Sequence, residues 1–108
     1  MHKPRRGTAE RLRTALRALF AEAGKIQHHI EKPWASITFS GTRHTLRLVF
    51  EGPDQIEGGE RFIADLPEHE FTIPGQLVAE ANVCAVEHTL VPQPRMLVEC
   101  ELLLLEEA

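Results

Sequence analysis

The sequence predicts an α+β fold in two layers, with one long N-terminal helix packed on an antiparallel sheet of four or five strands. Three observations predict it. Apolar residues recur at helical spacing from Leu12 to Ile30, apolar and polar residues alternate from Trp34 onward, and prolines separate the last two alternating segments. With 108 residues, 43% of them hydrophobic, the chain suffices for one domain with a modest core.

The predicted helix begins at Thr8 and ends near Lys32, before Pro33. Thr8 is a suitable N-cap, and Glu10 places a carboxylate in the first turn, where the helix dipole favours it. The apolar stripe steps by three or four residues, as one helix face requires, through Leu12, Leu16, Leu19, Ala23, Ile26 and Ile30. Residues 1–7 are predicted to be a flexible basic tail, and residues 8–108 a single domain.

A first hairpin is predicted from two alternating segments, Trp34–Ser40 and Arg43–Phe50, around the turn Ser40-Gly41-Thr42. The segment that follows, EGPDQIEGGE, is polar and rich in glycine. It predicts an exposed loop over Glu51–Glu60.

The longest hairpin is predicted in the last third of the chain, from Gln76–Leu90 and Met96–Leu105. Two prolines between them cannot lie inside a ladder and so form its loop. A loop centred on Gln93 would set Leu102 opposite Cys84, Val98 opposite His88, and Glu99 opposite Glu87. Before this hairpin, residues 61–66 fit either a helix or a strand, and Phe71–Ile73 fits a short strand.

Both faces of this long hairpin are predicted to be substantially apolar. One face would carry Val78, Cys84, Val86, Leu90, Met96, Val98, Cys100, Leu102 and Leu104. The other would carry Leu77, Ala79, Ala81, Val83, Ala85, Leu103 and Leu105, with the acids Glu87, Glu99 and Glu101. One helix covers only one face, so the second needs another cover. In so short a chain we expect that cover to be another subunit, with a homodimer favoured.

Charge is distributed unevenly along the chain. Residues 1–25 hold seven basic and two acidic residues, and residues 26–108 hold five basic and fourteen acidic residues. The basic residues Lys3, Arg5, Arg6, Arg13 and Arg17 are therefore candidates for phosphate contacts with a nucleic acid. However, the net charge is −4, and no aromatic–basic stacking platform is present. Nucleic-acid binding is thus an alternative rather than the favoured function.

Histidines supply the other candidate site. His44 and His88 both lie on apolar strand faces before Thr-Leu, and with Trp34 and Arg47 they would line a pocket for a small molecule or metal if their strands were adjacent. Histidines at the edge of the core would give the same pattern. A weaker metal candidate is His69 with Glu68 and Glu70, which gather only if PEHEF forms a turn.

The sequence gives little support for an enzyme. It has no G-x-S-x-G elbow and no phosphate-binding glycine loop, and its two cysteines lie in apolar strand segments without C-x-x-C spacing. No apolar run is long enough for a membrane helix, and charged residues interrupt the N-terminal segment where a signal peptide would be apolar. We therefore expect a cytoplasmic, non-enzymatic, self-associating protein without a cofactor, which binds a partner protein or small ligand.

Overall fold

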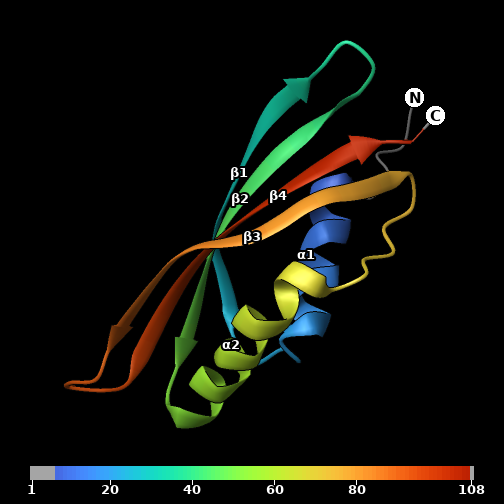
Figure 1. The fold of residues 1–108 in the computed structure, drawn as a ribbon. Coiled ribbons are helices and arrows are strands. Elements are labelled where there is room, and N and C mark those ends of the chain that lie inside the picture. Colours follow the sequence, from blue (N-terminus) through green and yellow to red (C-terminus); the bar gives the residue numbers. More distant parts are fainter. Residues whose placement is uncertain (1–6, 108) are drawn as a thin grey trace, which may run out of the picture.

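The computed structural model describes residues 7–107. Its four strands form one antiparallel sheet in the order β1-β2-β4-β3, and two helices lie against the same side of it (Figure 1). In chain order the elements are α1 (Thr8–Leu19), β1 (Lys25–Ala35), β2 (Ser40–Glu51), α2 (Pro53–Asp65), a short 3₁₀ helix (Leu66–Glu68), β3 (Gln76–Thr89) and β4 (Arg95–Glu106). The α+β class and the four-stranded antiparallel sheet are confirmed, whereas the single long helix is not.

The N-terminal helix is shorter than predicted. Its N-cap is Gly7 rather than Thr8, it ends at Leu19, and Ala21 and Glu22 turn the chain with φ values of 54° and 59°. Of the rest of the predicted stripe, Ala23 precedes β1, whereas Ile26 and Ile30 lie in β1, where a bulge turns Ile26 toward the core and Ile30 toward the opposite face. The predicted tail, apart from Gly7, lies outside the described residues.

Close packing explains why the chain turns before β1. Gly24 lies against the core, where an added Cβ would be 2.5 Å from Phe50 Cε1 and 2.9 Å from the Val49 carbonyl oxygen. Real Cβ atoms do not approach so closely, so only glycine fits this position without displacing its neighbours. Tertiary contact therefore determines the structure here, although the local sequence favours a longer helix.

The first hairpin forms, but its turn lies at residues 36–39 rather than at Ser40-Gly41-Thr42. The backbone N–H of Phe39 donates to Ser36 Oγ at 3.1 Å, and the N–H of Ser36 donates to the Phe39 carbonyl at 2.8 Å. Gly41 lies inside β2, where an added Cβ would meet the Leu104 carbonyl oxygen of β4. Pro33 lies in β1, an edge strand, which tolerates a missing N–H.

The predicted loop Glu51–Glu60 is wrong, because most of it belongs to α2. Gly52 enters the helix with φ of 86°, and Pro53 and Asp54 suit the first turn. The helix buries Ile56, Gly59 and Phe62, and residues 61–65 continue it. The glycines that predicted a loop allow close packing instead: a Cβ on Gly59 would lie 2.8 Å from the Phe50 ring and 2.6 Å from Met96 Cε.

The long C-terminal hairpin is confirmed, but its register differs from the predicted one. Two bulges interrupt β3, between Val78 and Glu80 and between Val83 and Ala85. The observed pairs are Leu102 with Ala81, Val98 with Val86, and Glu99 with Ala85. The predicted strand Phe71–Ile73 is reduced to a single bridge between Ile73 and Gln76.

The core lies between the helices and one face of the sheet. Phe20, Phe50 and Phe62 meet there edge to face or tilted, with ring centroids 5.5 to 6.5 Å apart. Around them the buried side chains alternate along β2 and β4, as half-buried strands require: Leu46, Leu48, Met96, Val98, Cys100, Leu102 and Leu104. Within residues 7–107, no helix has the length and apolar composition needed to cross a membrane.

Gly59 provides a test of this packing. We expect Gly59→Ala to lower the free energy of unfolding by about 1–2 kcal/mol, because overpacking costs about 1–3 kcal/mol and better helix propensity offsets at most about 1 kcal/mol. Urea denaturation measures the change. Glu60→Ala, at the exposed neighbouring position, should change stability by less than about 0.5 kcal/mol. A Gly59→Ala protein at least as stable as wild type would contradict the packing of α2.

Candidate functional site

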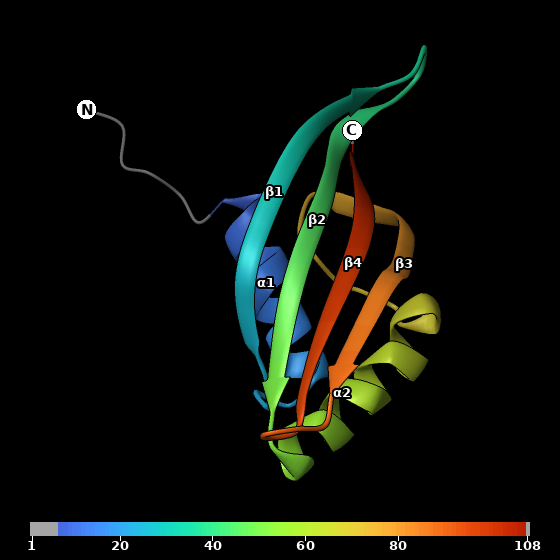
Figure 2. The ribbon, with the colours of Figure 1, turned by 90° about the vertical axis from the view of Figure 1, so that its left-hand side faces the viewer.

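The sheet has one face without a helix, which we call the open face (Figure 2). Strand register arranges its side chains in five rows, each crossing from β1 through β2 and β4 to β3. The rows are Trp34-Gly41-Leu105-Leu77, Lys32-Arg43-Leu103-Glu80, Ile30-Thr45-Glu101-Asn82, His28-Arg47-Glu99-Ala85 and Lys25-Val49-Leu97-Glu87. This face is more polar than predicted, because the bulges in β3 turn Ala81 and Val83 toward the core and leave Glu80 and Asn82 outside.

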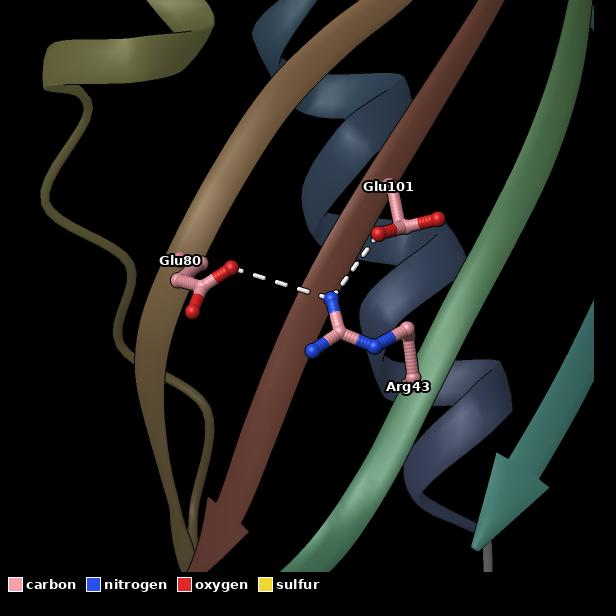
Figure 3. Close-up of polar contacts among 3 residues, drawn as sticks. All are labelled: Arg43, Glu80 and Glu101. Carbon is pink, nitrogen blue, oxygen red and sulfur yellow. Dashed lines mark hydrogen bonds and ion pairs between the residues drawn. The ribbon is translucent and has the colours of Figure 1, made fainter. Parts of the chain in front are cut away.

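An ion-pair bridge crosses the open face at Arg43 (Figure 3). The guanidinium lies 2.8 Å from Glu101 and 3.7 Å from Glu80, so it reaches from β2 across β4 to β3. Leu103 is paired with both Arg43 and Glu80 and is only 3% exposed, although no helix covers it. We infer that the stem of Arg43 and the bridged carboxylates shield this leucine from water.

The charges of the open face are divided by strand. Basic side chains lie on β1 and β2, and acidic side chains lie on β4 and β3, apart from Glu51 and Arg95 at the hairpin end. A second ion pair across the division joins Arg47 and Glu99 at 3.5 Å, and both side chains are about half exposed. Because such exposed pairs contribute at most about 1 kcal/mol, stability alone is a weak reason for this arrangement.

Shallow hollows and apolar side chains occupy the rest of the open face. Hollows of about 300 and 230 Å³ flank Arg47, and a third of about 550 Å³ is lined by Phe39, Leu77 and Leu105. Ile30 is 54% exposed and Leu77 is 52% exposed. Enclosed apolar pockets are typical of small-molecule sites, whereas these open hollows suit contact with another protein surface.

A second candidate site is buried on the helix side, where two histidines form a relay with α1. Arg13 approaches His29 Nδ1 at 2.9 Å, and His29 Nε2 approaches His44 Nδ1 at 2.9 Å. An arginine can only donate, so His29 Nδ1 must accept, and the neutral ring then carries its proton on Nε2. That proton is donated to His44 Nδ1, which leaves the His44 proton on Nε2.

The relay ends in an unsatisfied group. His44 has no exposed surface, and its Nε2 has no hydrogen-bond partner among the described residues. A buried donor without an acceptor costs about 1–3 kcal/mol. Burial, followed by the charge of His29, lowers the pKa of His44 to about 4, although Glu31 opposes this shift. Burial, followed by Arg13, also lowers the pKa of His29. Both rings are therefore neutral at pH 7.

The four predicted pocket residues do not form one site. His44 pairs with Leu102 of β4, whereas His88 pairs with Met96, which is six residues from Leu102 along the same strand. His88 is also exposed, whereas His44 is buried. Trp34 and Arg47 lie on the open face instead. The actual partner of His44, His29, was missed because its segment was assigned to a helix.

The predicted metal and nucleic-acid residues are also dispersed. His69 packs edge to face against Phe71, with ring centroids 4.5 Å apart. In the described part of the chain, His69, Glu68 and Glu70 do not form a group that could hold a metal, and neither do any other three potential ligands. Lys3, Arg5 and Arg6 lie outside the described residues. Arg13 is bonded to His29, and Arg17 lies in the last turn of α1, on the helix layer.

The cysteines offer no activated thiolate. Cys100 is buried, which raises its pKa to about 12. Cys84 lies at a bulge of β3 and is exposed, although its segment of the sequence is apolar. Partial burial and then the charges of Glu101 and Glu99 raise its pKa as well. Both shifts favour the unreactive thiol form.

The chain was also compared with known proteins. No family model, curated protein or solved structure matches it.

The buried histidine predicts a pH dependence of stability. The unfolded chain protonates His44 near pH 6.5 and the folded chain only near pH 4, so the unfolded state binds more protons between these values. We expect the titration of His44 to cost no stability above pH 6.5, to cost more as the pH falls to about 4, and to add no further cost below that pH. The loss is about 3 kcal/mol.

Urea denaturation at several pH values measures this loss. His44→Leu removes the titrating ring and should flatten the profile relative to wild type over this range. His28→Gln, which replaces an exposed histidine on β1, should retain the wild-type slope. If wild type and His44→Leu had equal slopes, His44 would not be a buried neutral histidine.

Proposed function

We infer that the chain is a non-enzymatic protein that self-associates through its open face. The observation that carries this proposal is the composition of that face: exposed apolar side chains lie beside basic groups on one half and acidic groups on the other. A second copy carries the same division of charge and therefore complements it. A partner protein with a similarly divided surface would compete for the same face.

The dimensions of the molecule suit such a contact. It is a plate of 48 × 33 × 21 Å, and the open face lies across its broad side. A stable interface of standard size buries about 800 Å² on each partner, which is less than the area of that side. Two free cysteines agree with the reducing cytoplasm in which we place the protein.

Other functions draw on weaker observations. A small ligand would have to bind in a shallow hollow, and nucleic-acid binding would depend on basic residues that lie mostly outside the described chain or contact His29. Neither proposal accounts for the apolar and the charged groups of the open face together, whereas self-association does.

Sedimentation equilibrium tests the proposal. At micromolar concentration we expect wild type to sediment with about twice the 12.2 kDa mass of one chain. The double variant Ile30→Gln/Leu77→Gln replaces two half-exposed apolar side chains of the open face, and it should raise the dissociation constant at least about ten-fold, which is about 1.4 kcal/mol.

The matched control is Ile37→Gln/Leu90→Gln, which makes the same replacements at exposed positions in the two hairpin turns. It should leave the dissociation constant unchanged. A wild-type monomer at micromolar concentration would refute self-association, and equal effects of the two double variants would place the contact elsewhere.

A further inference from the structure

We propose that the second copy docks about a two-fold axis that runs parallel to the strands, between β2 and β4. This geometry rests on the self-association inferred above and specifies the contact residue by residue. Two related copies placed face to face have their two-fold axis in the plane of contact. Because stacked sheets keep their strands within about 30° of each other, this axis runs either nearly along the strands or nearly across them, and the five rows of the open face distinguish these arrangements.

An axis parallel to the strands places β1 of one copy over β3 of the other, within the same row. Lys32 then lies over the partner's Glu80, and Lys25 lies over the partner's Glu87. In the row of His28, Arg47 lies over the partner's Glu99, and in the apolar row Trp34 lies over the partner's Leu77. Every one of these contacts joins opposite charges or two apolar groups.

An axis across the strands gives the opposite result. Each strand then lies over its own copy with the order of rows reversed, so that Glu101 meets the partner's Glu101 and Arg43 meets the partner's Arg47. The apolar row of Trp34 meets the row that carries Lys25 and Glu87. Like charges opposed across an interface are repulsive, and burial of the contact increases the repulsion.

Two features of the sheet support stacking of faces over pairing of edges. The edge strands are β1 and β3. Pro33 removes a donor from β1, and the two bulges of β3 interrupt its regular ladder, which are common protections against edge pairing.

Lys25 and Glu87 allow a direct test, because both are exposed and lie at opposite edges of one row. Neither forms an ion pair with another residue of 7–107. We expect Lys25→Glu alone and Glu87→Lys alone to weaken the dimer about ten-fold each, since each creates two like-charge contacts per dimer. The double variant Lys25→Glu/Glu87→Lys inverts both charges and should restore wild-type affinity.

Sedimentation equilibrium at low and high salt gives the dissociation constants, and thermal melting of each variant checks its fold. The differences among the four proteins should shrink at high salt, because salt screens exposed charges. If wild type is a dimer but the single variants dimerise as it does, or the double variant fails to recover, the parallel axis is wrong while self-association stands. If wild type is a monomer, the proposed function itself fails.

Discussion

The structure depends on one constraint: a four-stranded sheet has two faces, and this chain has helices for only one of them. Both helices are needed on that side, because the core packs Phe20, at the end of α1, and Phe62 of α2 against Phe50 of β2. The other face must therefore remain compatible with water while it presents hydrophobic residues. The chain meets this requirement by shielding Leu103 with the bridge from Arg43 to Glu80, rather than by replacing the leucine with a polar residue.

The class of fold could be predicted because alternation over β2 and β4 extends for many residues and agrees with burial on one side. The limits of the elements could not, and Ile26 and Ile30 show why. Their spacing of four predicts one shared face for a helix and for a regular strand alike, whereas the bulge at residues 26–28 turns Ile26 to the core and Ile30 to the open face. What decides is the contact of Gly24 with Phe50, which joins residues distant in sequence. Likewise, Gly58-Gly59 predicted a loop, because local propensity does not include the close packing of a helix on residues distant in sequence.

The buried histidines were harder still to predict. His44 was recognised as a histidine on an apolar face, but its partner His29 was assigned to a helix and so could not be placed beside it. The structure shows a relay whose polarity is set by Arg13 and whose last proton has no acceptor within residues 7–107. A leucine at position 44 would avoid that cost, so the histidine makes this part of the core sensitive to pH without adding to its stability at neutral pH.

The bulges of β1 and β3 affect both the pairing of the strands and the set of side chains on the open face. Lys25 and Lys32 are seven residues apart, as are Glu80 and Glu87, and an odd separation places two residues on opposite faces of a regular strand. One bulge lies between the members of each pair, at residues 26–28 of β1 and 83–85 of β3, and it brings both members to the open face. The bulges of β3 therefore help to create the division of charge, and they add to a shift of pairing that begins at the loop, where Thr89 pairs with Arg95 and the hairpin is centred on residue 92 rather than on Gln93. Without the bulges of β1 and β3, each edge strand would present one charge outward and one toward the core, where an unpaired charge is costly.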